Sequence, residues 1–359
     1  MTAESFSAEA RAPRRVAVAE HFRNRIVRGE LAPGARLPSY SEMAQALGAC
    51  KSTVQDAMDE LKRDGFLEAR ERSGVFVAER PPHLCHYAVV VAGDEMESAP
   101  AFATALRREA DTMRREKSGR LLIYADVAVN NPEYFRLLRD MEANRVAGLI
   151  FQRDPRDFGL AGTPVLMAPG MPRVAITAPS YAQAGLAVVW PDFAAFARKA
   201  TGYLAARGRR RLACLLYEDV ESGPVAFREM IPRECGLSME PEWYHVVPPR
   251  SVRNVVRLLM RLPESERPDA LLVVDDNLVE QASLGLLDAG VRIGEEIDVV
   301  GHCNYSSVVP SHVRMKRLGW DDRELLRVCM KQIDRMRAGE AAAPPIAVEP
   351  LFDHEMRKD

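Results

Sequence analysis

Short, uninterrupted apolar runs alternate with amphipathic helical segments over most of the chain, and this alternation constrains the fold more than any other feature. The expected strands are residues 87–92, 121–125, 147–151, 164–167, 186–190, 212–217, 270–274 and 297–301. The expected helices are residues 100–117, 131–143, 193–207, 252–262 and 278–289. Strands that are apolar throughout are typical of parallel sheets covered by helices on both faces. Because the strands are too many for one compact sheet and the pattern restarts near Asp192, we expect two doubly wound α/β lobes that face each other across a cleft.

The first 80 residues follow a different pattern. The expected elements are a helix from Val16 to Gly29, a helix opened by a capping box at residues 39–42 and ended by a turn at Gly48, a helix over 52–63, and alternating strands at 66–70 and 75–78. Three helices followed by a two-stranded wing form a winged helix-turn-helix. This α+β module places its third helix in the major groove of DNA.

These patterns divide the chain into four parts. We expect a disordered tail at residues 1–14, the winged helix at 15–80, a linker at 81–86 that begins with two prolines, and the two-lobed domain at 87–359. Within the two-lobed domain, the expected first lobe is 87–190 with 313–340, and the expected second lobe is 191–312 with 341–359.

Composition sets limits on partners and location. The net charge is −2, so any basic footprint for nucleic acid must be local. The six cysteines form no CxxC pair, which indicates free thiols in a reducing cytoplasm. His83, Cys85 and His86 are the only local cluster that resembles a metal site, and without further ligands nearby we expect a linker there and no metal. No apolar run approaches the length of a membrane span, so we expect a cytoplasmic protein without membrane partners.

The motifs of several enzyme classes are missing from the sequence. The phosphate-binding patterns GxGxxG and GxxxxGK[ST] do not occur, and neither does the G-x-S-x-G turn of serine hydrolases. We therefore expect no catalytic residues and no cofactor.

Four blocks in the N-terminal part carry a specific resemblance. PGARLPS at 33–39, GACKSTVQDAM at 48–58, LKRDGFL at 61–67 and SGVFV at 73–77 are similar, in this order, to the winged helix of the GntR family. The resemblance implies that DNA is bound by the start of the third helix, the start of the helix before it, and the wing. The residues at those positions are Ser39, Ser41, Cys50, Lys51, Ser52, Thr53, Gln55, Arg70, Arg72 and Gly74.

Four of these positions depart from the family pattern. Cys50 stands where Ser or Thr is usual, and Lys51, Ser41 and Gln55 stand where Arg is common. Fewer guanidinium groups mean less bidentate recognition of guanine, whereas the paired donor and acceptor of Gln55 favour adenine. We expect an altered operator sequence.

Five blocks in the C-terminal part carry a second resemblance. They are PAF at 100–102, VAGLI at 146–150, RGRRRLA at 207–213, PDALLVVDD at 268–276 and AGVRIGEEIDVVG at 289–301. These blocks resemble the LacI-type, periplasmic-binding-protein-like sensor domain. A GntR-type head on a LacI-type body is similar to the arabinose-repressor subgroup. This implies a homodimer that binds a pseudo-palindromic operator in double-stranded DNA, usually as a repressor, with a small-molecule effector in the cleft.

Six positions correspond to the family's effector pocket. They are Asp94, Phe102, Arg228, Asp276, Asn304 and Trp320. A carboxylate and an arginine with aromatic walls suit a carbohydrate, since charged groups bind hydroxyls and rings stack on the apolar sugar face. Each main candidate has a structural alternative. Asp276 would cap the following helix, Arg228 would be a solvated helix residue, and Trp320 would pack in the core.

The pocket also departs from the family. His302-Cys303-Asn304 replaces Phe-Asp-Asp, and Asp275 replaces Asn. The alternative to a sugar sensor is therefore a DNA-binding regulator whose C-terminal domain is a ligand-independent dimerisation scaffold.

Overall fold

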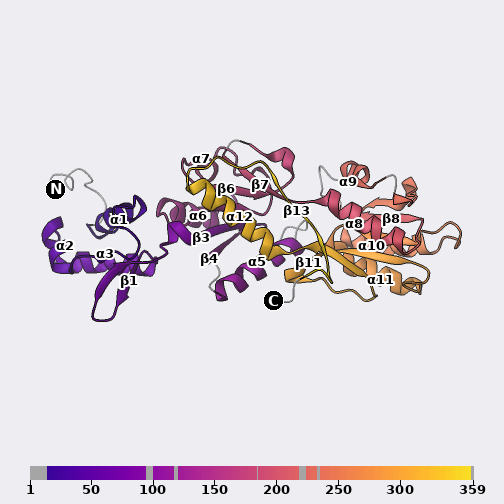
Figure 1. The fold of residues 1–359 in the computed structure, drawn as a ribbon, viewed down its shortest axis with the longest axis horizontal. Coiled ribbons are helices and arrows are strands. Elements are labelled where there is room, and N and C mark those ends of the chain that lie inside the picture. Colours follow the sequence, from indigo (N-terminus) through magenta and orange to yellow (C-terminus); the bar gives the residue numbers. More distant parts are fainter. Residues whose placement is uncertain are drawn as a thin grey trace.

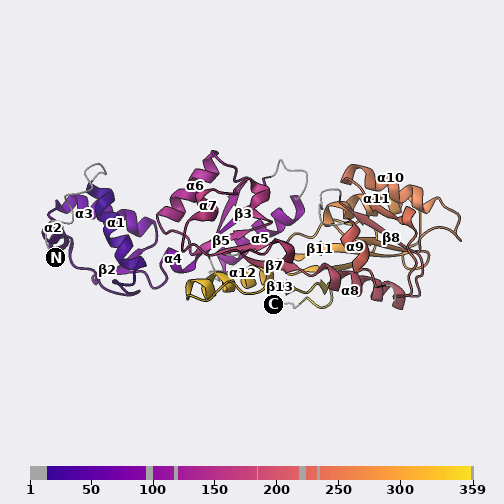
Figure 2. The same ribbon diagram turned by 90° about the horizontal axis from the view of Figure 1, so that it is seen from above.

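The computed structural model describes residues 14–93, 100–116, 120–183, 185–217, 224–232 and 235–356, and within them all side chains except those of residues 14, 100 and 224–226. Three bodies follow one another along the long axis: an N-terminal head, a first lobe and a second lobe (Figures 1 and 2). Among the described residues, no helix has both the length and the apolar character that crossing a membrane requires.

The head is the expected winged helix. Its elements are α1 (Arg14–Val27), α2 (Tyr40–Leu47), α3 (Lys51–Arg63), β1 (Leu67–Arg70) and β2 (Gly74–Val77). The capping box forms as predicted, because the Ser39 hydroxyl accepts from the backbone N–H of Glu42 while the Glu42 carboxylate accepts from that of Ser39. Gly48 ends α2 with a φ of 58°, a left-handed conformation that favours glycine. Apolar side chains from all these elements, including Phe22 and Met58, share one core.

The first lobe is a six-stranded sheet with helices on both faces. Across the sheet the strands are β13 (Ile346–Val348), β7 (Ala187–Pro191), β6 (Arg173–Ile176), β5 (Gly148–Phe151), β3 (His86–Val91) and β4 (Arg120–Ala125), all parallel to their neighbours. The helices are α5 (Pro100–Arg115), α6 (Pro132–Glu142), α7 (Pro164–Met167) and α12 (Asp322–Arg337). α5 and α12 share a core that contains Leu106 and Ile333. α6 and α7 contribute Leu137 and Val165 to a second core.

The second lobe repeats this plan. Across its sheet the strands are β14 (Leu351–Phe352), β12 (Lys316–Trp320), β11 (Asp298–Asn304), β10 (Ala270–Val273), β8 (Leu212–Leu216) and β9 (Tyr244–Val246), and only β14 is antiparallel to its neighbour. α8 (Phe193–Ala206) and α9 (Pro224–Met230) pack in one core, and α10 (Pro249–Met260) and α11 (Val279–Ala289) pack in the other. In both lobes the first five strands have the order 2-1-3-4-5, which confirms the doubly wound class.

Several sequence-based boundaries are wrong. Residues 164–167 form the short helix α7, and the strand lies at β6 instead. β12 was expected in the first lobe but pairs with β11 of the second, while β13 was expected in the second lobe but pairs with β7 of the first. The expected linker at 81–86 contains α4 (Pro82–Cys85) and the first residue of β3. Of the expected tail, residues 1–13 lie outside the described residues, and Arg14 already begins α1.

Three segments cross between the lobes, and hydrogen bonds to one backbone carbonyl oxygen connect the three segments. The crossings follow β7, β12 and β13. The Val348 carbonyl oxygen accepts from the backbone N–H of Asp192 at 2.9 Å and from the Trp320 indole Nε1–H at 2.8 Å. Each crossing thus contributes to a single hydrogen-bonded junction between the lobes.

Candidate DNA interface and effector site

The first half of α3 presents its polar side chains to solvent. Val54, Ala57, Met58 and Leu61 are buried in the head, which turns the opposite face of the helix outward. Of the residues predicted on this helix, Cys50, Lys51, Ser52 and Gln55 are exposed and Thr53 is half-buried. This exposed, uncovered helix start is the arrangement that entry into a DNA major groove requires.

The two serines at the start of α2 differ in availability. The Ser39 hydroxyl is engaged as the N-cap, whereas Ser41 is exposed on the first turn. A cap that fixes α2 also fixes the turn that leads into α3. Ser39 therefore supports the interface whether or not it contacts DNA.

The wing carries two arginines in different electrostatic situations. Arg70 forms ion pairs with Glu68 at 2.6 Å and Glu79 at 2.8 Å, and its guanidinium lies over the Phe76 ring. Arg72 is exposed at the tip, with a φ of 56° and no side-chain partner among the described residues. Arg72 and the neighbouring Gly74, also at positive φ, therefore form the part of the wing that is free to approach DNA.

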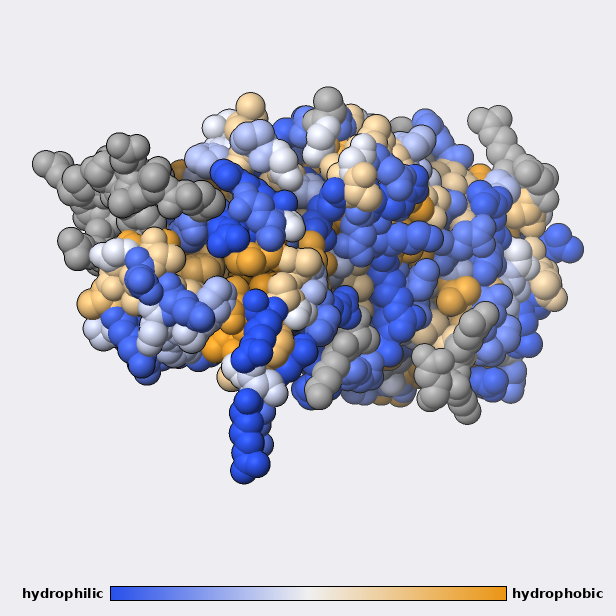
Figure 3. Space-filling view, turned by 60° about the vertical axis from the view of Figure 1, so that its left-hand side comes forward, coloured by the Kyte–Doolittle hydropathy of each residue, from blue (hydrophilic) through white to orange (hydrophobic). Residues whose placement is uncertain are grey.

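The wing projects from the head next to a groove. Figure 3 shows this hydrophilic projection beside a gathering of apolar side chains. The groove lies between α1, α2 and the wing, with Phe22, Leu37 and Met43 among its apolar lining residues and Arg36 and Arg72 among its cations.

Cys50 has an acidified thiol at the start of α3. Its Sγ lies 2.8 Å from Thr53 Oγ1 and 3.3 Å from Ser52 Oγ. Hydrogen bonds from these two hydroxyls stabilise the thiolate and lower the pKa of Cys50 to about 7. The charge at the exposed start of α3 therefore changes near neutral pH.

In the second lobe, three polar side chains meet at the carboxyl ends of neighbouring strands. Asp276 follows β10, and His302 and Asn304 lie at the end of β11. The Asp276 carboxylate accepts from Asn304 Nδ2 at 2.7 Å and lies 3.6 Å from His302 Nδ1. The Asp276 backbone N–H donates to the same His302 nitrogen at 3.1 Å. Burial favours the neutral acid, but His302 and Asn304 outweigh it and lower the pKa of Asp276.

The capping alternative for Asp276 does not apply. Asp275 is the residue that caps the turn, since its carboxylate accepts from the Asn277 backbone N–H at 2.8 Å. The Asp276 carboxylate is therefore used only in the cluster. Burial, together with the Asp276 charge, raises the pKa of Asp275 to about 6.

Aromatic rings enclose the cluster on one side. Trp320 stacks on Phe196 with ring centroids 5.6 Å apart and meets His302 edge-on at 5.2 Å. Trp320 is only 3% exposed and belongs to the core of the second lobe, so the packing alternative describes its contacts. It is also a neighbour of the polar cluster through His302.

The other predicted pocket residues do not join this cluster. Arg228 is exposed on α9, with its guanidinium 5.8 Å from the Tyr244 ring centroid at the β9 edge of the sheet. Phe102 packs against the core of the first lobe. Asp94 lies outside the described residues. The structure therefore brings together Asp276, Asn304 and Trp320 of the six predicted positions.

Two buried polar groups were not predicted as site residues. His302 Nε2 and Asp322 Oδ1 are buried without a hydrogen-bond partner among the described residues. Asp322 is fully buried, its other oxygen accepts from the Ser306 backbone N–H at 2.9 Å, and burial raises its pKa to about 6. Asp322 lies two residues after Trp320, the last residue of β12, and this strand was not predicted from the sequence.

The first lobe reaches this edge through α5. The Ala101 backbone N–H donates to Asn277 Oδ1 at 3.3 Å, and the Ser306 hydroxyl donates to Glu109 at 3.0 Å. The carboxyl edge of the second sheet and the start of α5 thus face each other, as expected for a site between the lobes.

Comparisons with known proteins agree with this two-part architecture. Residues 14–77 match the family described as bacterial regulatory proteins, gntR family, and residues 201–347 match the periplasmic binding protein-like domain. The chain is similar to an arabinose metabolism transcriptional repressor from Geobacillus stearothermophilus, with 23% identity over 302 residues, 81% of this chain and 82% of the relative. A repressor of the same description from Halalkalibacterium halodurans is 21% identical over 347 residues, 90% of this chain and 91% of the relative.

A solved structure shares the fold of the two-lobed domain. It is a LacI family transcriptional regulator from Arthrobacter sp. FB24 in complex with lactose, with a TM-score of 0.56 and 13% identity. The match covers 75% of this chain and 97% of that structure.

Proposed function

Because the chain combines a GntR-family winged helix with a periplasmic-binding-protein-like domain of LacI-type fold, we propose that it is a transcriptional repressor whose binding to operator DNA is controlled by a sugar between the lobes. The two arabinose repressors to which it is similar extend over both domains. A protein that acts on chromosomal DNA works in the cytoplasm, which is the location we propose.

The DNA-binding half of the proposal rests on the uncovered start of α3. Lys51 and Gln55 are exposed on one helix face, and Arg72 is free at the wing tip. We propose a homodimer in which two heads contact the two halves of a pseudo-palindromic site. Gln55 would recognise adenine through its paired donor and acceptor.

The observation that supports the sensor half is the cluster of Asp276, His302 and Asn304. This cluster lies beside Trp320 and opposite the start of α5. A carboxylate and an amide bind vicinal hydroxyls, and the neighbouring rings suit the apolar face of a sugar. A ligand that contacts both this edge and α5 would favour one angle between the lobes.

The burial of the same residues supports a second candidate function. Asp276 is 2% exposed and Asn304 is 3% exposed, so the cluster is satisfied largely by the protein's own groups. This favours a DNA-binding regulator whose two-lobed domain is a ligand-independent dimerisation scaffold.

One experiment separates the two functions. The full-length protein selects binding sites from random double-stranded DNA, with and without a panel of monosaccharides that includes arabinose. We expect a palindromic motif whose enrichment one sugar abolishes. A motif that is indifferent to every sugar would support the scaffold, and no motif would contradict DNA binding.

Two variants test whether the sugar response depends on the cluster around Asp276. Asp276→Asn removes the carboxylate charge with little change of shape, so we expect the motif to persist and the sugar response to disappear. The matched control is Asp288→Asn, because Asp288 is an exposed residue of the same lobe that pairs with Arg253 at 2.7 Å. Equal responses in the two variants would exclude the cluster as the effector site.

A further inference from the structure

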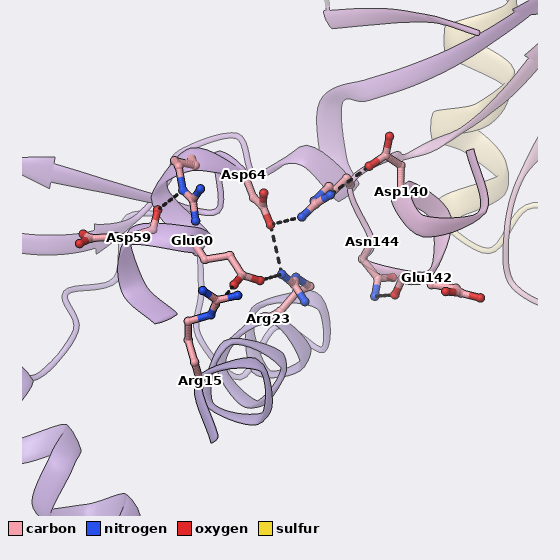
Figure 4. A network of polar contacts seen from close by, with 10 residues as sticks. Arg15, Arg23, Asp59, Glu60, Asp64, Asp140, Glu142 and Asn144 are labelled. Carbon is pink, nitrogen blue, oxygen red and sulfur yellow. Dashed lines mark hydrogen bonds and ion pairs between the residues drawn. The ribbon is translucent and has the colours of Figure 1, made fainter. Parts of the chain in front are cut away.

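Asp64 connects the recognition helix to both domains of the chain. It follows α3 directly, and its carboxylate is 12% exposed. Asp64 Oδ2 lies 3.1 Å from Arg23 Nη2 of α1 and 2.9 Å from Arg145 Nη2 of the first lobe. Figure 4 shows Asp64 between Arg23 of the head and the C-terminal end of α6 in the first lobe, where Asp140 lies. The end of α3 is thus held by one cation from its own domain and one from the sensor domain.

The first lobe holds Arg145 in place. Its second guanidinium nitrogen, Nη1, lies 3.1 Å from Asp140 Oδ1 on α6. The other oxygen of Asp140 accepts from the Tyr124 hydroxyl at 2.6 Å, and Tyr124 is fully buried in the sheet. Arg145 therefore bridges Asp64 to a side-chain network that is anchored in the core of the first lobe.

The short connection between the domains is packed as well. His83 on α4 stacks against Phe66 of the head with centroids 5.9 Å apart, and Arg337 of α12 donates to the Leu84 carbonyl oxygen at 3.3 Å. Burial and the charge of Arg337 lower the pKa of His83 to about 4, which keeps the ring neutral at physiological pH. The connection therefore behaves as a packed junction and not as a free tether.

We propose that Arg145 is a positioning residue for DNA recognition, which locks the end of α3 to the first lobe so that head and lobe move as one body. The effect of this lock on operator binding rests on the proposed function. The reading end of α3, at Cys50, lies about 20 Å from Asp64 along the helix, so a turn of about 10° at the junction displaces it by about 3 Å. A fixed head therefore selects one spacing between the two half-sites of an operator.

The contact can be removed while both carboxylates keep a hydrogen-bond donor. In Arg145→Ala, Asp64 keeps Arg23, and Asp140 keeps the Tyr124 hydroxyl. The matched control is Arg139→Ala, because Arg139 is exposed on α6, the helix just before Arg145, and its side chain has no partner among the described residues.

The test measures binding of the full-length protein to operators whose half-site spacing varies one base pair at a time. The unsubstituted protein and Arg139→Ala are expected to bind one spacing, whereas Arg145→Ala binds its optimum about 5-fold more weakly and tolerates neighbouring spacings. Arg145→Lys should recover part of the selectivity, since an ammonium cannot engage both carboxylates as a planar fork does. Unchanged spacing selectivity in Arg145→Ala, or an equal loss at all spacings, would overturn the proposal.

A measurement without DNA keeps the proposal testable if no operator is found. Small-angle scattering of the unsubstituted protein should fit a single placement of the head. Arg145→Ala should require a range of placements, with an unchanged circular dichroism spectrum. A single placement in both proteins would refute the lock independently of the proposed function.

Discussion

Neutralising Lys51 should weaken DNA binding and make the affinity depend less on salt concentration. Lys51 is the first residue of α3, it is exposed, and its side chain has no partner among the described residues. Arg70 on the wing is the natural comparison, since Glu68 and Glu79 already neutralise its charge. The structure thus predicts that Lys51→Gln removes a phosphate contact and that Arg70→Gln removes very little.

The magnitude follows from counterion release. Each phosphate neutralised contributes about 0.9 to the slope of log K against log salt concentration. With two heads on one operator, Lys51→Gln should reduce the slope by about 1.8. Between about 50 mM and 200 mM salt, the affinity of the variant should then fall about 12-fold less than that of the unsubstituted protein.

The assay is a titration of labelled operator at four or more salt concentrations. Arg72→Gln should reproduce the effect of Lys51→Gln, because Arg72 is exposed at the wing tip and its side chain has no partner among the described residues. If Arg70→Gln and Lys51→Gln reduce the slope of log K against log salt concentration equally, ion pairing on the wing does not decide which cations contact phosphate. An unchanged slope for Lys51→Gln would remove α3 from the phosphate contacts.

Two further predictions concern pH. Because the pKa of Cys50 is lowered to about 7, raising the pH from 6 to 8 adds a negative charge to the DNA-facing surface, and operator affinity should fall. Cys50→Ser should abolish this trend in the same binding assay, and an identical trend would contradict the assignment. Burial raises the pKa of Asp322 from 3.8 to about 6, so the folded state binds the proton more tightly and stability falls as pH rises through this window. Asp322→Asn should therefore stabilise the sensor domain by up to about 3 kcal/mol at pH 7.5, with no gain near pH 4, as measured by thermal unfolding.

Local signals in the sequence were sufficient for the head. The capping box at Ser39 and Glu42 and the turn at Gly48 act within a few residues, so the sequence contains all the information that their geometry needs. The polar ends of β10 and β11 were predictable for a similar reason. Asp276 lies three residues after the apolar strand β10, Asn304 ends β11, and the carboxyl ends of parallel strands meet at one edge.

Tertiary contacts decided the parts that were missed. The strand β6 begins with Arg173, which looks unsuitable for a core, but its guanidinium donates to the carbonyl oxygens of Val165, Ala168 and Met171. β12 and β13 join one sheet or the other according to where the chain crosses between the lobes. No local sequence pattern predicts the position of those crossings. In the sequence, His302 was only part of a departure from the family pattern, because its role depends on the approach of Asp276 and Trp320.

The same contacts indicate how a sensor of this build would transmit a signal. We expect the lobes to turn about the junction at Val348, where two hydrogen bonds to its carbonyl oxygen tie the three crossings together. Opening the cleft separates α5 from the second lobe and breaks the bonds from Ala101 to Asn277 and from Ser306 to Glu109. At about 1 kcal/mol for each hydrogen bond, the two states differ by an amount that the binding energy of a small ligand exceeds. In the homodimer that we propose, with Arg145 holding each head to its first lobe, a change in the angle between the lobes would rotate each α3 helix against the rest of the dimer, so a ligand of modest affinity would suffice to change operator binding.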